Sequence, residues 1–216
     1  MPDLNFHVEA AESVRHAITP QLAFRLGVED RTAGENIHTV VLRCQIQIET
    51  PRRRYDADEK ELLLDLFGEP ERWGQTLRPM LWTNTSITVP AFTGSTLVDV
   101  PVPCTFDFNN AATKYFHALK EGQVPVTLLF SGTVFYDRGD GALQVAQIPW
   151  DRQATYRLPV EVWKNMMDLY YPNTAWLDLR RDVFEQLYHY KVKHGIPTWE
   201  QTIEALLPQL EKKAAS

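Results

Sequence analysis

Cysteine is scarce in this sequence, which contains only Cys44 and Cys104 among its 216 residues. Neither belongs to a Cys-x-x-Cys pair, and two thiols do not make the disulfide framework of small secreted proteins. Residues 1–5 lack the basic start of a signal peptide, and no apolar run is long enough to span a bilayer. We therefore expect a soluble cytoplasmic protein that is not inserted into a membrane.

Motifs for catalysis and metal binding are also lacking. The sequence has no Walker-type phosphate loop, no Gly-x-Ser-x-Gly elbow and no His-Glu-x-x-His run. Its six histidines are scattered, and the five-residue spacing of His189 and His194 does not bring them onto one helical face. We expect no catalytic, metal-binding or cofactor-binding residues and hence a non-enzymatic protein. An enzyme whose site forms only in three dimensions is the alternative.

The two cysteines fall on the apolar side of their predicted strands, where cysteine behaves as a small hydrophobic residue. Cys104, Asp107 and His117 form the one conceivable Cys–His–Asp set. A nucleophilic thiol requires an electropositive, partly exposed setting, and no motif here supplies one. Core packing is the preferred interpretation of both cysteines.

Positive charge is in deficit, since the formal net charge is −6. This balance argues against a nucleic-acid partner. The single basic run, Arg52–Arg54, precedes an acidic segment that can neutralise it. A solvated loop is the preferred interpretation of this run, and an anion site is the alternative.

The middle of the chain alternates between apolar and polar residues with period two, which is typical of strands with one buried face. The pattern predicts strands over residues 22–28, 40–48, 81–89, 98–108, 124–136 and 143–148. A hairpin turn is predicted at Asp137–Gly141. Pro101 and Pro103 indicate an edge strand or a bent strand, because each proline removes a donor from the ladder.

Helical periodicity interrupts these strands and dominates after Pro159. Asp56 or Asp58 caps a predicted helix that ends at Gly68, and Asn110 caps another. The later helices are predicted over residues 162–170, from 173 or 174 to 195, and from Thr198 onward. The long middle helix is expected to turn Trp176 and Leu179 inward.

Strands followed by helices indicate an α+β fold. We expect an antiparallel immunoglobulin-like β-sandwich of seven or eight strands, with inserted helices and a helical C-terminal region. Residues 1–158 would form the sandwich core, and residues 159–216 would form helices that pack on the same core. The chain would then be a single globular domain.

Aromatic residues are concentrated in the C-terminal third of the chain, and most are expected in the core. Helix faces cannot bury all of them. Those predicted to reach the surface and contact a partner are Tyr170, Tyr171, Trp176 and Tyr188. Pro172 must end the helix before it, so the turn around Tyr171 is expected to be short and rigid. A purely structural role for Tyr171 and Trp176 is the equal alternative.

Several blocks of the sequence together resemble an uncharacterised bacterial family that is defined only as a domain of unknown function. They are Ile18–Leu26, Ile37–Ile46, Pro70–Gly74, Val102–Asp107, Leu129–Phe135 and Ile148–Trp150. Genes of that family often lie beside uptake nickel–iron hydrogenase genes, which implies an accessory or maturation role. The strand-rich half followed by helices is also faintly similar to the secretion chaperone SecB.

Together these features predict an accessory protein that binds another, unidentified protein, in the assembly or maturation of a hydrogenase-type redox enzyme. No cofactor is expected. A chaperone-like holder of unfolded chains is the main alternative. The oligomeric state is left open by the sequence.

Overall fold

The computed structural model describes residues 1–32, 35–108, 110–137, 139 and 141–214, with 208–214 described by their backbone alone. The chain forms two compact units, Met1–Trp176 and Leu177–Ser216. The predicted hairpin turn at 137–141 includes positions 138 and 140, which lie outside the described residues. Among the described residues, no helix is long and apolar enough to cross a membrane.

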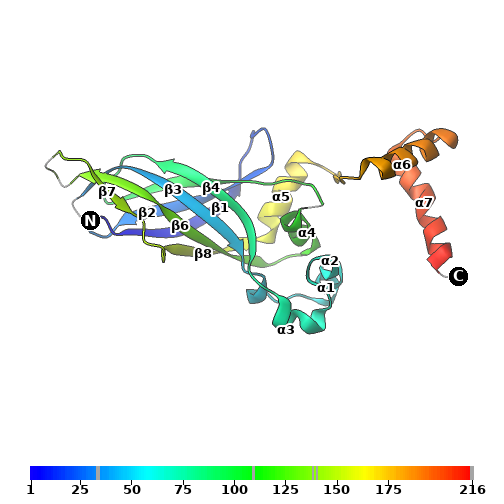
Figure 1. Ribbon diagram of the computed structural model, residues 1–216, viewed down its shortest axis with the longest axis horizontal. Helices are drawn as coiled ribbons and strands as arrows, with labels where there is room; N and C mark the ends of the chain where they lie inside the picture. Colours follow the sequence, from blue (N-terminus) through cyan, green and yellow to red (C-terminus); the bar gives the residue numbers. More distant parts are fainter. Residues whose placement is uncertain (33–34, 109, 138, 140, 215–216) are drawn as a thin grey trace. The chain divides into compact units, whose positions relative to one another are not determined.

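The first unit contains two antiparallel sheets, as the alternation predicted (Figure 1). One sheet has the order β1-β2-β5, made of Leu4–Ser13, Gln21–Asp30 and Ser95–Pro103. The other has the order β4-β3-β6-β7, and β8 also pairs with β6. Its strands are β3 (Asn36–Ile48), β4 (Met80–Val89), β6 (Gln123–Asp137), β7 (Gln144–Gln147) and β8 (Gln153–Pro159).

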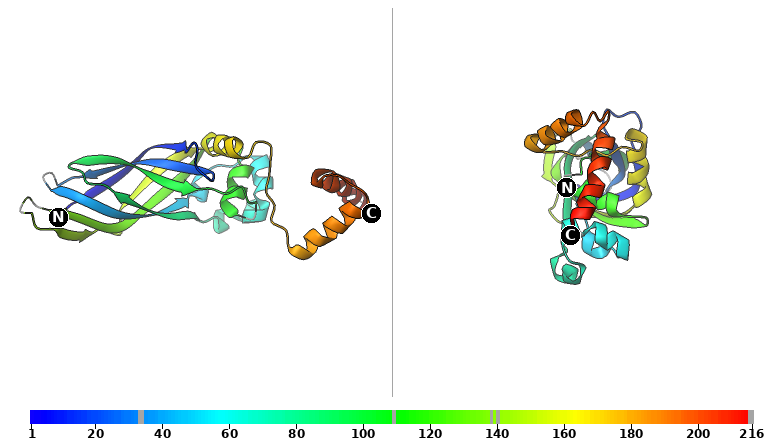
Figure 2. Two further views of the ribbon diagram at one scale, coloured as in Figure 1. Left: turned by 90° about the horizontal axis from the view of Figure 1, so that it is seen from above. Right: turned by 90° about the vertical axis from the view of Figure 1, so that its right-hand side faces the viewer.

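A common hydrophobic core lies between the two sheets (Figure 2). Phe6 on β1 stacks on Phe130 on β6, with ring centroids 4.4 Å apart. From Val40 to Ile48 the even positions of β3 are fully buried and the odd positions are not, as the period-two pattern predicted. The buried set is Val40, Leu42, Cys44, Ile46 and Ile48.

The proline-bearing strand is an edge strand, as predicted, because β5 pairs with β2 alone. It ends at Pro103, so the expected extension through Phe106 and Phe108 is wrong. Cys104 N instead donates to Pro20 O, after which the chain leaves the sheet.

Two strands escape the period-two analysis. In β1 the register shifts between Val8 and Ala10, and this bulge interrupts the alternation. The other, β8, is short and carries small or charged residues on its outer face. Strand β1 is established by its pairing with β2, and strand β8 by its pairing with β6.

Five α-helices of the first unit gather at one end of the sheets (Figures 1 and 2). They are α1 (Ala57–Leu62), α2 (Leu64–Phe67), α3 (Trp73–Thr76), α4 (Ala111–Ala118) and α5 (Val160–Tyr170). Short 3₁₀ turns lie at Thr50–Arg52 and Pro70–Arg72. Asp56 and Glu59 form a capping box at α1, and Asn110 caps α4, as the sequence indicated.

Helix α5 belongs to the same compact unit as the sheets, which extends to Trp176. The sequence had placed the end of the sandwich core at residue 158. The second unit contains α6 (Arg181–Lys193) and α7 (Trp199–Ala214). The expectation of a single globular domain stays a prediction.

The start of α6 differs from the expected one at Asn173 or Thr174. Asn173 adopts a left-handed φ of 54°, which stops helical propagation. Trp176 then forms an isolated parallel bridge with Asp107, and Phe108 N donates to Trp176 O at 3.3 Å. Pairing with a distant segment therefore overrides the helical pattern, and Trp176 and Leu179 do not lie on a helix.

Arg53 contradicts the interpretation of the basic run as a solvated loop. Its guanidinium donates to both carboxylate oxygens of Glu59, at 2.8 and 2.9 Å, and the two side chains are only 8% and 5% exposed. A further donation to Glu121 O at 2.6 Å ties this pair to the segment between α4 and β6. Arg52 and Arg54 are exposed, as expected for solvated residues.

Burial alone would raise the pKa of the Glu59 carboxyl. Hydrogen bonds from Arg53 and from the Lys120 amide outweigh burial and hold that pKa below its ordinary value. A depressed folded-state pKa stabilises the fold above the unfolded-state pKa of about 4.3, and this contribution is lost as the pH falls through the folded-state value.

We predict that Glu59→Gln lowers the free energy of unfolding by about 3 kcal/mol at pH 7, because it leaves a buried guanidinium without a countercharge. The deficit should shrink as the pH falls below the unfolded-state pKa of about 4.3 and through the lower folded-state pKa, where the wild-type carboxyl becomes protonated. Urea denaturation at several pH values measures both effects. Glu61→Gln, on the exposed side of α1, is the matched control, and an equal loss in this control would contradict the prediction.

We predict that Ile46→Ala lowers the free energy of unfolding by about 2–5 kcal/mol, because it removes a fully buried side chain in mid-strand. Gln45→Ala, at the next position on the outer face, should cost less than about 1 kcal/mol. Chemical denaturation of both variants makes the comparison. Equal costs would mean that β3 is buried on both of its faces.

Candidate functional site

The predicted aromatic contact residues divide between the two units. Tyr170, Tyr171 and Trp176 follow one another at the end of the first unit, whereas Tyr188 lies on α6 in the second. The connection between α5 and α6 is ten residues long, from 171 to 180, and not the short turn that was expected.

Tyr170 anchors the end of α5. Its hydroxyl donates to Val14 O at 2.8 Å and accepts from the amide of Ala17 at 3.0 Å. Both partners lie in the connection between β1 and β2. The hydroxyl is thus engaged within the fold, and α5 is fixed against the first sheet at its C-terminal end.

Tyr171 belongs to a small group of rings beyond α5. It stacks on Phe106 with a centroid distance of 5.6 Å and an interplanar angle of 11°, and it contacts Trp176 at 4.9 Å. The Asp107–Trp176 bridge holds the two backbone segments together. The ring of Tyr171 is half-buried, while 53% of Trp176 is exposed.

A depression of about 440 Å³ opens beside this aromatic group. Trp163 and Met167, both buried residues of α5, contribute apolar surface to it, and polar side chains from α4, α5 and the following turn line it as well. The lining consists of Phe106, His117, Trp163, Lys164, Met167, Asp168, Tyr171, Asn173, Thr174 and Ala175. A cavity of this size can accept a small ligand or the side chains of a protein segment.

The polar groups around the depression carry mixed charge. Burial and, to a smaller extent, the neighbouring Lys164 lower the pKa of His117, so its imidazole is neutral near pH 7. Its ring lies edge-on to Phe108 at 4.7 Å. The ammonium of Lys164 donates to Lys120 O at 3.1 Å. The rim therefore contains a neutral histidine, one cation, Lys164, and one carboxylate, Asp168. These groups give the depression no strong preference for a ligand of either charge.

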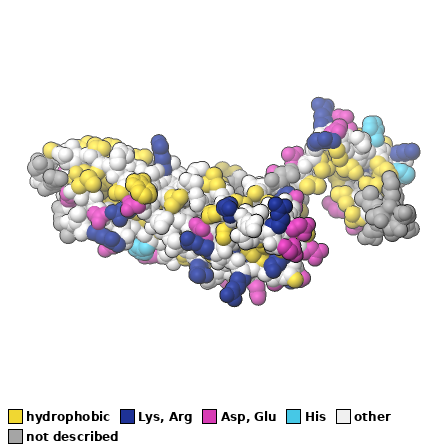
Figure 3. All heavy atoms as spheres, turned by 60° about the horizontal axis from the view of Figure 1, so that its bottom comes forward, with side chains coloured by type: hydrophobic (Ala, Val, Ile, Leu, Met, Phe, Trp, Pro, Cys, Tyr) yellow, Lys and Arg dark blue, Asp and Glu magenta, His cyan; other side chains and the backbone are white. Residues whose placement is uncertain are grey.

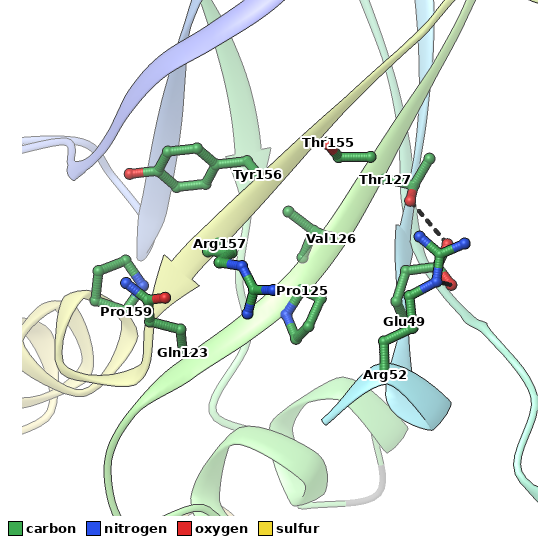
Figure 4. Close-up of a pocket in the computed structure, with 10 residues that line it drawn as sticks. All are labelled: Glu49, Arg52, Gln123, Pro125, Val126, Thr127, Thr155, Tyr156, Arg157 and Pro159. Carbon is green, nitrogen blue, oxygen red and sulfur yellow. Dashed lines mark hydrogen bonds and ion pairs between the residues drawn. The ribbon is translucent and has the colours of Figure 1, made fainter. Parts of the chain in front are cut away.

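A second depression, of about 520 Å³, lies where β6 and β8 run past the 3₁₀ turn at residues 50–52 (Figure 4). Arg52 and Arg157 reach it from different elements. Glu49 accepts a hydrogen bond from the Thr127 hydroxyl at 2.8 Å, and the Arg52 Nε lies 3.6 Å from the same carboxylate. Glu49 and Thr127 are both buried polar residues of this groove, and their hydrogen bond is made within the fold.

The cysteines are held as thiols. Burial raises the pKa of both Cys44 and Cys104 to about 12. The Cys104 thiol donates to Val102 O at 3.4 Å. Both groups are therefore protonated near pH 7, which argues against a nucleophilic Cys104 beside His117.

Within the described part of the chain, no group of three or more His, Cys, Asp and Glu side chains could hold a metal ion.

Sequence reasoning missed the residues that build the depression around Tyr171. Phe106 falls in a predicted strand, and Trp163 and Met167 fall in the predicted helix over residues 162–170, to which no site is assigned. The signal that could have found them is the hydrophobic run of α5 immediately before Tyr171-Pro172. Its C-terminal end must come to the surface where the proline stops the helix.

The fold and the site define a two-sheet α/β protein with an aromatic, partly apolar surface depression. A family model described as a family of unknown function (DUF6084) matches residues 1–215. The chain belongs to this family. No protein with a curated description matches the sequence.

We predict that alkylation of the native protein at pH 8 is slow for both Cys44 and Cys104. The thiolate fraction rises on the order of a thousandfold when a thiol with a pKa near 12 recovers its unfolded value of about 8.5. Mass spectrometry after a timed pulse of iodoacetamide, with and without denaturant, measures the rates. Rapid stoichiometric labelling of either native thiol would revive the enzyme interpretation.

Proposed function

We propose that this protein is a non-enzymatic accessory protein that binds another protein through the surface formed by Tyr171, Trp176 and the adjoining depression. The observation that carries the proposal is the contact of the half-buried Tyr171 with the exposed Trp176 on a backbone that is fixed at two points. Tyr170 anchors one end of the segment, and the bridge from Trp176 to Asp107 anchors the other.

The physical reason is the low entropic cost of binding with such residues. Aromatic side chains that already contact one another lose little conformational freedom on association, and Tyr and Trp are enriched among the residues that dominate interface energies. The depression beside them has buried apolar side chains in its lining and a polar rim. An interface core has the same arrangement, with a desolvated centre and a wetter edge.

The resemblance of the sequence to a family linked with nickel–iron hydrogenase genes supports a partner in the assembly or maturation of a redox enzyme. Binding to a folded or partly folded enzyme subunit agrees with a recognition surface that lacks strong charge. Tyr170 is proposed to position the surface, since its hydroxyl is engaged within the fold.

We also propose that the two sheets form an immunoglobulin-like sandwich. The support is the strand order β1-β2-β5 in one sheet and β4-β3-β6-β7 in the other. In that fold, the first, second and fifth strands share a sheet, while the third and sixth pair centrally in the second sheet.

A holder of unfolded chains is the second candidate, and the exposed apolar side chains of the second unit favour it. A holder would bind many unfolded polypeptides and suppress their aggregation. An accessory protein would instead bind one partner with a defined stoichiometry.

We predict that Trp176→Ala and Tyr171→Ala each weaken binding to the partner at least about tenfold. Affinity purification from the cells that produce the protein, followed by mass spectrometry, identifies the partner, and titration of the purified partner gives Kd. Trp176→Ala should change the free energy of unfolding by less than about 1 kcal/mol, because half of the side chain is already exposed.

The matched control is Trp150→Ala, which removes a tryptophan that is 92% exposed and lies between β7 and β8. This variant should retain the partner. If Tyr171→Ala and Trp176→Ala keep full affinity, or if they lose binding only in proportion to lost stability, the aromatic group has a structural role alone. Suppression of aggregation of unrelated unfolded proteins would favour the holder.

A further inference from the structure

The second unit leaves its large apolar side chains exposed. Among the residues of α6 and α7 whose side chains are described, Thr202 is the single buried one. Figure 3 shows hydrophobic side chains, coloured yellow, on the surface of this unit. Eight of them in this unit are 37–64% exposed: Leu177, Leu179, Phe184, Tyr188, Val192, Trp199, Ile203 and Leu207. Such a pair of helices requires a further surface to cover its apolar side.

The apolar residues form two ridges with four-residue spacing. Helix α6 carries Phe184, Tyr188 and Val192, and helix α7 carries Trp199, Ile203 and Leu207. The ring of Trp199 lies 5.3 Å from that of Phe184 and 6.3 Å from that of Tyr188, so the ridges join into one surface. Ridges of this spacing are the ones that pack into the grooves of another helix.

We propose that this surface is the contact between two copies of the chain, which pair through α6 and α7. In a two-fold contact both copies use the same surface, so that a contact of residue i with residue j is matched by a contact of j with i. The joined apolar ridges of α6 and α7 satisfy this condition, because an apolar surface can pack on its own copy.

The charges of α6 are complementary when the two-fold axis lies across the helix, so that the two copies of α6 run antiparallel. Asp182 lies in the first turn of α6 and Glu185 just beyond it, while Lys191 and Lys193 lie in the last turn. Antiparallel pairing places the acidic part of one α6 beside the basic end of the other. The helix dipoles are then also opposed, which favours the arrangement.

The acidic residues remain accessible to a second copy. Arg180 pairs with Asp182 at 3.0 Å and Arg181 pairs with Glu185 at 3.1 Å, but these side chains are 57–90% exposed, and ion pairs at such exposure are weak. Over residues 177–207 there are five acidic and four basic side chains. Two copies of this unit therefore meet without the repulsion that the whole chain's net charge of −6 would suggest.

The exposed area also matches a dimer contact. Aromatic side chains each carry about 150–250 Å², so eight large apolar residues at these exposures offer on the order of several hundred Å². One partner in a standard stable interface contributes about 800 Å². An apolar surface of this area, together with the polar residues at its edge, is large enough for a specific contact between two copies of the chain.

The test is the oligomeric state of the full chain, measured by sedimentation velocity between about 1 and 100 µM, where interfaces of micromolar affinity are resolved. The wild-type chain should sediment as a dimer. Tyr188→Asp and Ile203→Asp should each raise the dimer Kd at least tenfold. Gln186→Asp, an exposed polar position on the opposite side of α6, is the control and should leave the dimer intact. Circular dichroism checks that the helices of each variant remain folded.

Charge reversal separates a specific contact from general stickiness. Asp182→Lys with Glu185→Lys, or Lys191→Glu with Lys193→Glu, should each weaken self-association. An equimolar mixture of the two double variants should form heterodimers, because the reversed ends then match. A chain that stays monomeric up to about 100 µM, a dimer that survives Tyr188→Asp, or a mixture that does not associate would each overturn the proposal. A monomer that instead captures unfolded chains through this surface would show that the holder interpretation is correct.

Discussion

The pairing of β3 with β6 is the constraint on which the rest of the first unit depends. The ladder runs from Asn36 opposite Asp137 to Ile48 opposite Val126, and the other edge of β6 receives both β7 and β8. Gly132 shows how close the strands come, because a Cβ there would lie 2.0 Å from Val41 O. Since these residues are far apart in sequence, the ladder forms only when the chain has collapsed around its core.

The same ladder positions the candidate site. The chain enters α5 directly from β8, and Trp163 on that helix stacks on Phe116 of α4 at 5.3 Å. Helix α5 therefore cannot move without disturbing the core. The aromatic group at its end inherits this rigidity, which is what a contact surface needs if binding is to cost little entropy. The Arg53–Glu59 pair fixes the neighbouring helix α1 to the segment after α4 in a similar way.

The two units differ in what their side chains do. In the first unit the apolar faces meet one another in one buried core, although single large apolar side chains such as Ile18 and Trp150 are exposed. In the second unit, almost no described side chain is buried. A pair of short helices has too little apolar surface to form a core by itself, so its stability must come from what it packs on. The proposed self-association and the proposed partner site therefore use different surfaces. Different physical arguments support the two proposals.

The sequence by itself determined the strands and helices whose patterns are local. The buried even positions of β3 from Val40 to Ile48, the edge position of β5 and the Asp56 and Asn110 caps follow from side-chain alternation, proline chemistry and short-range hydrogen bonding. Tertiary structure decided the features that depend on distant partners. Trp176 left its predicted helix because Asp107 offered a bridge, Arg53 became buried where the distant carbonyl of Glu121 accepts from it, and β8 exists because β6 had a free edge. In each case the deciding energy is a contact between residues far apart in the chain, which no local pattern encodes.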